Sequence, residues 1–151
     1  MPIGAIGKDF EITDTQPLTE AERQGLAEAL DDEYKTRATY ARVIEDFGGV
    51  RAFVNIVEAE KRYISALLGL FERYDIAPPS DRWTGAPPRF LSLLEACNKA
   101  VQAETDNVAI YDRVLKTSTR ADILSVYHAW REASLDRHLP AFRRCAERKG
   151  Q

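Results

Sequence analysis

Apolar side chains recur every three to four positions over four long stretches of the chain, which is the spacing of one face of an α-helix. None of these stretches alternates strictly between apolar and polar residues, as a half-buried strand does. We therefore expect an all-α fold. The predicted parts are an irregular lead-in at residues 1–17 and a four-helix bundle over residues 18–148, with helices at about 19–47, 50–74, 89–116 and 120–148.

Short signals mark the ends of the first helix. Thr19 is followed three residues later by Glu22, which has the form of a capping box and satisfies free N–H groups where a helix begins. Gly48 and the glycine after it supply a stop, because glycine accepts the left-handed conformation that ends many helices. So short a connection predicts that the second helix folds back antiparallel to the first.

Residues 75–88 contain four prolines, a composition that cannot continue a helix and that suits a crossover. The chain is therefore expected to form two antiparallel helical hairpins joined by this Pro-rich crossover. Thr119 and Asp122 give a second capping signal at the start of the fourth helix. Pro140, two residues past His138, removes a helical hydrogen bond and predicts a bend there.

Three of the predicted helices carry a glutamate on their apolar face when each residue is advanced by about 100°. Glu33 falls on the stripe of the first helix, Glu60 on that of the second and Glu104 on that of the third. The fourth helix places His138 on its stripe, without an acid. Because Glu33 lies 15 residues before Gly48 and Glu60 lies 12 residues after it, the hairpin should bring both to nearly the same height.

Burying an ionised carboxylate costs several kcal/mol, and three together repel one another, so positive charge or protons must accompany them. Oxygen and imidazole ligands that project from facing helices are typical of sites for iron or manganese in bundle proteins. Arg37 lies on the same stripe as Glu33 and offers an alternative, a metal-free polar layer neutralised by the guanidinium.

Composition excludes several functional classes. Lys and Arg number 21 and Asp and Glu 24, giving a net charge of −3 with both signs mixed, so no nucleic-acid surface is expected. No stretch approaches the roughly 18 uncharged residues of a membrane-spanning helix, and no leader is evident, which predicts no membrane contact and a cytoplasmic protein. Cys97 and Cys145 are expected to be two small buried thiols.

Over about residues 18–146 the chain resembles the ferritin-like proteins and, within them, the uncharacterised domain-of-unknown-function family 2202. Glu33 precedes Tyr40 by seven residues, like the ligand glutamate and tyrosine of that family's first helix. Residues 103–107 repeat the Ala-Glu-Thr-Asp-Asn of its third helix letter for letter, and residues 134–142 resemble its fourth-helix motif of Ser, variable residues and His-Leu-x-Ala-Phe.

Two positions depart from the rubrerythrin-like pattern. Tyr63 stands where the second helix usually carries the histidine of a Glu-x-x-His pair. Leu135 stands where the fourth helix carries the glutamate of the second such pair. The ligand set is therefore expected to be reduced, with Tyr63 as a packing residue, an additional ligand or an electron donor.

The resemblance implies a carboxylate metal-binding protein, an iron-dependent oxidoreductase that reacts with oxygen or peroxide. Its implied centre holds one or two iron ions, with manganese as an alternative metal. A metal-free bundle that serves as a structural or binding module is the competing interpretation, and a homodimer is left open. The implied ligands are Glu33, Glu60, Glu104 and His138, with Tyr40, Asn107 and Arg37 as the polar residues around them.

Overall fold

The computed structural model describes residues 16–150, which form helices and connecting segments without a strand among them. The all-α prediction is confirmed. Most of the predicted lead-in, residues 1–15, lies outside the described part of the chain. The elements are α2 (Glu20–Phe47), α3 (Arg51–Arg73), α4 (Leu93–Val114), the 3₁₀ turn η1 (Leu115–Thr117), α5 (Ala121–Ala133), the π-helical turn η2 (Ser134–His138) and α6 (Leu139–Gly150).

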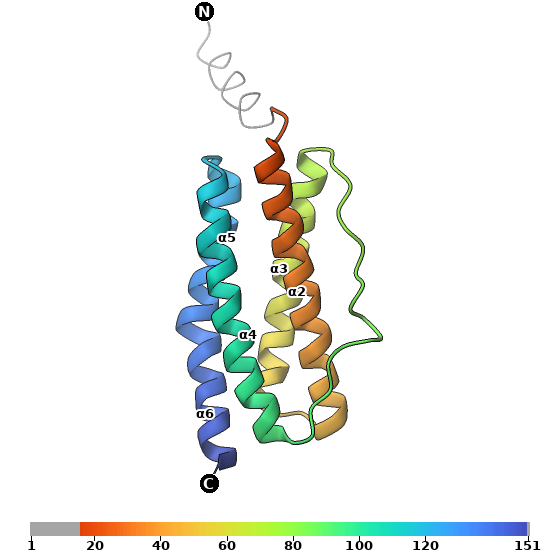
Figure 1. The fold of residues 1–151 in the computed structure, drawn as a ribbon, viewed down its shortest axis with the longest axis vertical. Coiled ribbons are helices and arrows are strands. Elements are labelled where there is room, and N and C mark those ends of the chain that lie inside the picture. The colour runs from red at the N-terminus through yellow and green to blue at the C-terminus, as the bar shows by residue number, and fades with distance from the viewer. Residues whose placement is uncertain (1–15, 151) are drawn as a thin grey trace, which may run out of the picture.

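The helices pack as four long rods, the fourth of which is formed by α5, η2 and α6 in succession (Figure 1). The helices α2 and α3 run antiparallel, as do α4 and the fourth rod, and residues 74–92 descend along the outside of α2. Across residues 16–150, no helix combines the length and the apolar character needed to cross a membrane.

The start and the end of α2 follow the local sequence. The backbone N–H of Glu22 donates to Thr19 Oγ1 at 3.1 Å, and the backbone N–H of Thr19 donates to Glu22 Oε1 at 2.9 Å, which confirms the capping box. Gly48 ends the helix at φ 92°, in a conformation that glycine adopts at low cost. The predicted boundaries of the first helix are therefore confirmed to within a residue.

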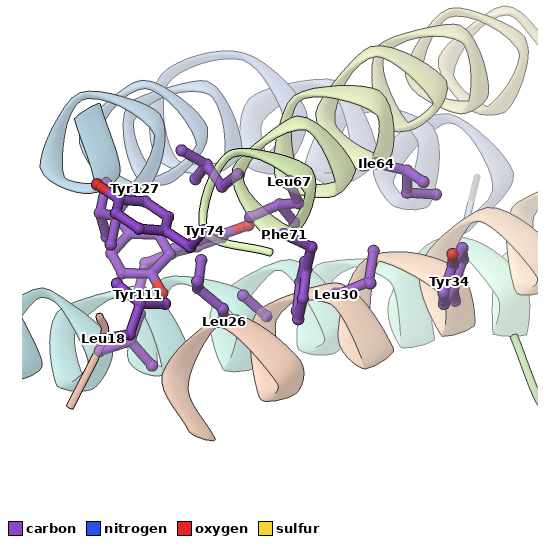
Figure 2. Close-up of a cluster of buried hydrophobic side chains, with 14 residues drawn as sticks. Leu18, Leu26, Leu30, Tyr34, Ile64, Leu67, Phe71, Tyr74, Tyr111 and Tyr127 are labelled. Atoms are coloured by element: carbon purple, nitrogen blue, oxygen red, sulfur yellow. The ribbon is translucent and has the colours of Figure 1, made fainter. Parts of the chain in front are cut away.

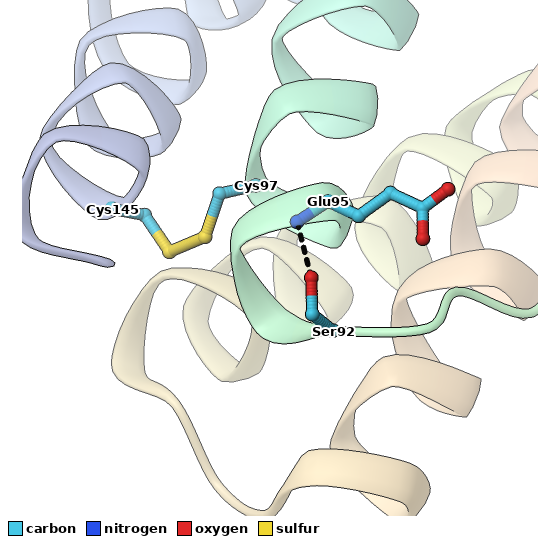
Figure 3. Close-up of a disulfide and its surroundings, with 4 residues drawn as sticks. All are labelled: Ser92, Glu95, Cys97 and Cys145. Carbon is cyan, nitrogen blue, oxygen red and sulfur yellow. Dashed lines mark hydrogen bonds between the residues drawn. A yellow bond between two sulfur atoms is a disulfide. The ribbon is translucent and has the colours of Figure 1, made fainter. Parts of the chain in front are cut away.

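One predicted helix start and one predicted helix cap are wrong. The third helix begins at Leu93 rather than near residue 89, because Ser92 Oγ caps it by accepting from the backbone N–H of Glu95 at 3.1 Å (Figure 3). The capping signal expected at Thr119 does not operate, since α5 begins after Arg120 without a side-chain cap. The carboxylate of Asp122 instead accepts a hydrogen bond from Tyr74 at 2.7 Å.

Residues 74–92 are fastened to α2 by polar contacts. Asp31 on α2 accepts two hydrogen bonds from Arg82, at 2.9 and 3.0 Å, and one from the indole N–H of Trp83 at 3.1 Å. Arg37 donates to Asp81 at 3.0 Å, and its side chain is 30% exposed. Arg37 thus pairs with the connecting segment, which corrects the prediction that it accompanies the buried glutamates.

The core consists of two large apolar clusters separated by a polar layer, and of a small third cluster of Ala59, Tyr63 and Ala133. One cluster occupies one end of the bundle (Figure 2) and includes Leu26, Leu30, Leu67, Phe71, Tyr111 and Tyr127. The other includes Tyr40, Phe53, Cys97, Ala100, Phe142 and Cys145. Along each rod the buried acid or imidazole lies in sequence between members of the two clusters, so apolar packing fixes the polar layer from both sides.

The prediction of two free thiols is wrong. Cys97 on α4 and Cys145 on α6 form a disulfide across 48 residues of sequence, close to the start of α4 (Figure 3). The bond ties the end of the fourth rod to the third. Disulfides persist mainly in oxidising compartments, and inside the cells of hyperthermophiles.

The fourth rod changes its helical type where a bend was predicted. The backbone N–H of Leu139 donates to the carbonyl of Ser134, five residues earlier, which defines the π-helical turn. Pro140 follows directly and has no N–H to offer to Asp136, the residue four positions before it. Turns of this kind often occur at functional sites, and His138 is the last residue of this one.

Candidate metal centre

The four residues predicted as ligands come from four different rods and are all buried. Exposed fractions are 1% for Glu33 on α2, 2% for Glu60 on α3, 1% for Glu104 on α4 and 3% for His138 at the end of η2. The wheel analysis therefore placed each of these side chains in the interior correctly.

Three of the four converge. Glu60, Glu104 and His138 each offer one ligand atom such that all three atoms lie within 4.8 Å of one another. Within residues 16–150, no other group of three or more metal-ligating side chains has its ligand atoms this close together. Glu33 is buried in the same layer but does not belong to this set.

Glu104 is the best anchored member of the cluster. Its Oε2 accepts a hydrogen bond from the hydroxyl of Tyr40 at 2.8 Å, and its Oε1 lies 2.8 Å from His138 Nδ1. Burial, together with the charge of Glu104, raises the pKa of Tyr40 well above its usual value, so this phenol stays protonated and donates. Tyr40 therefore orients the carboxylate, in agreement with its predicted place beside the ligands.

Two buried carboxylate oxygens lack any hydrogen-bond partner within residues 16–150, namely Glu60 Oε2 and Glu33 Oε2. Leaving a charged group unpaired in the interior costs more than leaving a neutral one, so such atoms call for a cation or a proton. Glu60 is itself a member of the three-residue cluster. An oxygen-rich donor set with one imidazole, in which an anionic oxygen remains unsatisfied, fits a divalent cation.

Glu33 belongs to a hydrogen-bonded network beside the cluster. Asn107 donates to Glu33 Oε1 at 2.9 Å and to Asp32 Oδ2 at 2.6 Å, and its own Oδ1 accepts from Ser134 at 2.7 Å. Tyr111 donates to Glu33 Oε1 at 3.0 Å. Burial, with a smaller effect of Asp32, raises the pKa of Glu33 well above its usual value. Asn107 thus contacts a predicted ligand, as proposed from its spacing.

Sequence reasoning missed three members of this network. Neither Asp32 nor Tyr111 was a candidate site residue, and Ser134 was named only as part of a motif. The available signal was Asn107, because a buried amide needs several hydrogen-bond partners on the helices that face it.

Tyr63 stands at the position where the resemblance led us to expect a histidine. Its hydroxyl lies 3.4 Å from His138 Nε2, and its ring packs on Trp130 with centroids 4.0 Å apart. Burial raises the pKa of Tyr63, against a hydrogen bond from Arg137 that lowers it. The side chain therefore approaches the cluster from the His138 side as a neutral phenol.

The second departure from the pattern expected from the resemblance, Leu135, has no effect on the interior. Leu135 is 42% exposed, so a glutamate at this position would point to solvent in this structure. The buried neighbour is Ser134, which hydrogen-bonds Asn107. The cluster at Glu60, Glu104 and His138 consequently does not lose a ligand through Leu135.

Asp32 predicts a pH dependence for the metal-free protein. Burial raises its pKa to about 6 from 3.8, against the opposing hydrogen bond from Asn107. The folded state therefore holds a proton that the unfolded chain releases near pH 4, and stability falls as pH rises towards 6. Between pH values below 4 and above 6, the free energy of unfolding should fall by about 3 kcal/mol through this group. We expect Asp32→Asn to raise the free energy of unfolding at pH 7.5 by about 1–3 kcal/mol and to change it little at pH 4, measured by urea denaturation.

Asp31→Asn is the matched control, because the hydrogen bonds from Arg82 hold the pKa of Asp31 below its usual value and give the opposite slope. That variant should lose stability at pH 7.5. An Asp32→Asn variant with the same effect at both pH values would contradict the assignment.

Comparisons with known proteins identify the fold and no function. A hypothetical protein from Methanococcus jannaschii, MJ0754, superposes with a TM-score of 0.78 at 25% identity, over 90% of this chain and 85% of that one. A conserved hypothetical protein from Mycobacterium tuberculosis, rv2844, does so with a TM-score of 0.74 at 17% identity, over 84% of this chain and 91% of that one. No protein-family model and no curated protein matches the chain. The chain is therefore similar in fold to these two hypothetical proteins.

Proposed function

We propose that this chain is a ferritin-like carboxylate metal-binding protein, built from two antiparallel helical hairpins joined by a Pro-rich crossover. The observation that carries the proposal is the convergence of Glu60, Glu104 and His138, three buried side chains from separate rods with ligand atoms within 4.8 Å of one another. Glu60 Oε2, buried and without a partner in the described chain, supports it further.

The donor chemistry favours iron, with manganese as the second choice. Two carboxylates and one imidazole suit either metal, and the two negative charges are offset by one divalent ion. A second ion would draw on Glu33, whose Oε2 is also buried and unpartnered among residues 16–150. One ion held by the three-residue cluster is the simplest form of the proposal.

The proposed reaction class is oxidation with oxygen or peroxide. Bound iron would supply the redox chemistry. Tyr40 orients Glu104 through its 2.8 Å hydrogen bond, and the apolar clusters above and below keep water from the layer. Tyr63, with its hydroxyl 3.4 Å from His138 Nε2, is the neutral phenol placed to serve as an additional ligand or an electron donor.

Anaerobic reconstitution with ferrous iron tests this proposal. We expect about one iron per chain by elemental analysis after desalting, and at least about tenfold weaker binding in Glu60→Gln, because the substitution removes the anionic oxygen that lacks a partner. Glu58→Gln is the matched control, since Glu58 lies two residues away on α3 and its exposed carboxylate pairs with Lys61. A natural chain that retains no metal would refute the proposal.

The alternative is a metal-free bundle that serves as a structural or binding module. The observation in its favour is that Glu104 and His138 already satisfy each other at 2.8 Å, with Tyr63 against the remaining ring nitrogen. Under this alternative, Tyr63→His should create iron affinity that the natural chain lacks. Equal iron binding by the natural chain and the variant would exclude it.

The sequence predicts the compartment and the partners of the protein. They are the cytoplasm, a bound metal ion and a small oxidant such as oxygen or peroxide. The Cys97–Cys145 disulfide weighs towards an oxidising compartment. Fractionation of the host cell, with the thiols alkylated at lysis, would decide between the two.

A further inference from the structure

A second feature adjoins the cluster on the side of His138. A cavity of about 290 Å³ lies between α3 and the turn from η2 into α6, with Tyr63 and His138 among the residues that line it. Most of the remaining lining is apolar and includes Ala52, Ile56 and Ala141. This volume is at the lower end of the range for small-molecule pockets, so an occupant must be small.

Two guanidinium groups line this cavity. Arg62 and Arg137 are both exposed, and neither forms an ion pair within residues 16–150. Arg62 makes only a long contact, 3.4 Å, to the backbone carbonyl of Glu58, whose carboxylate is taken by Lys61. Arg137 interacts with the hydroxyl of Tyr63 and lowers its pKa. Both positive charges are therefore available to a ligand.

No acidic residue of the described part of the chain lines this cavity, which distinguishes it from the other cavity near the polar layer. That second cavity, of about 330 Å³, is lined by Asp32 and Asp106 as well as by Lys35 and Lys99, so its charges balance. The lining of the cavity at Arg62 and Arg137 instead carries two positively charged side chains and no carboxylate from residues 16–150. Guanidinium groups favour carboxylates because their planar donors match the two oxygens.

We propose that the cavity between α3 and α6 binds a small organic monocarboxylate, held by Arg62 and Arg137 with its apolar part against Ala52, Ile56 and Ala141. The apolar lining favours an organic carboxylate over a fully hydrated inorganic anion. The ligand would lie beside Tyr63 and His138, which makes it a candidate substrate or co-substrate of the centre. Only that assignment rests on the proposed function, since the binding itself requires no metal.

Butyrate is a suitable probe, and the natural full-length chain in its metal-free form is titrated with it while amide resonances are followed by NMR. We expect saturable shifts that centre on Ala59, Tyr63 and His138, with a dissociation constant of about 1 mM. The neutral isostere 1-butanol should bind at least about tenfold more weakly, because it cannot pair with the guanidinium groups.

Variants separate this site from non-specific attraction. The double variant Arg62→Gln/Arg137→Gln should weaken butyrate binding at least about tenfold. Arg23→Gln removes a comparable exposed guanidinium from a different cavity and should have no effect. Equal binding of butyrate by the double variant, equal binding of butanol, or shifts spread over the whole surface would each overturn the proposal. Failure of iron binding would leave this result unchanged, so the two proposals fail separately.

Discussion

Glu22→Ala should lower the free energy of unfolding by about 3–5 kcal/mol, the cost of breaking a buried ion pair by removing one partner. Glu22 is 4% exposed and accepts hydrogen bonds from Arg120 Nε at 3.0 Å and from Ser118 Oγ at 2.5 Å. It also completes the capping box with Thr19. One side chain therefore fixes the start of α2 against the start of α5, and its loss leaves several buried polar groups without their partner.

The pH dependence of this effect has a definite sign. Burial opposes ionisation of Glu22, but hydrogen bonds from Ser118, Thr19 and Arg120 outweigh it and lower the pKa below 4.5. A carboxyl whose pKa is lowered in the folded state stabilises the protein at pH values above its pKa in the unfolded chain. This contribution is lost as the pH falls through the pKa of the folded state. The difference between natural chain and variant should therefore shrink below about pH 4.

Glu20→Ala is the control for Glu22→Ala, because Glu20 is exposed and lies in the same first turn. Chemical denaturation at pH 7 should place Glu20→Ala within about 1 kcal/mol of the natural chain. Equal losses in the two variants would mean that the first turn alone, rather than the contact with α5, accounts for the effect.

Removal of the disulfide should cost about 2–4 kcal/mol, because the bond closes a loop of 48 residues and restricts the unfolded chain. Cys97→Ala/Cys145→Ala is the appropriate variant, since both side chains lie in an apolar cluster and serine would bury two hydroxyl groups. Urea denaturation with and without dithiothreitol measures the effect. The natural chain should lose stability on reduction, whereas the variant should not respond to the reductant.

A natural chain whose unfolding is insensitive to dithiothreitol, after the thiol count confirms reduction, would contradict this expectation. The bond joins α4 to α6, and α6 reaches the core mainly through Phe142 and Cys145. We therefore expect reduction to affect the last turns of α6 first, which amide exchange measured along α6 can follow.

The helices, and the burial of the four predicted ligands, were predictable because helical periodicity is a local property. Helix boundaries that depend on a capping side chain were harder to predict than the helices themselves. Ser92 lies only three residues beyond the predicted start of the third helix, and its hydroxyl, rather than the periodicity, sets the boundary. The capping box at Thr19 was found correctly, whereas the same spacing at Thr119 and Asp122 misled, because the carboxylate of Asp122 pairs with Tyr74, which lies far away in the sequence.

The third helix shows where the wheel fails. The periodicity of the sequence puts Val101 and Val108 on the same helix face as Glu104, yet both are only half-buried. The buried positions are Ala96, Cys97, Ala100, Glu104, Asn107, Tyr111 and Val114. A wheel weighted by large aliphatic side chains misses small alanines and polar residues, and so it left Asn107 undecided between an interior and a surface role.

Long-range partners were out of reach of the sequence pattern. Arg37 lies on an inward stripe but pairs with Asp81, 44 residues away on the connecting segment, and no single-helix pattern contains that segment. Cys97 and Cys145 lie on different rods, so their pairing depends on the relative heights of α4 and α6. Glu33 lies in the same layer as the cluster, but the direction of its carboxylate depends on hydrogen bonds from Asn107 and Tyr111, which lie on another helix.

The π-helical turn lets the fourth rod hold one residue more than a regular α-helix of the same length. A π turn absorbs that residue within a single turn, so the helix after it keeps almost the same phase as the helix before it. Deleting one residue within Ser134–His138 would therefore restore a regular α-helix and leave Phe142 and Cys145 in the core. The side chains within the turn itself would change direction, so the extra residue sets where Ser134 and His138 point.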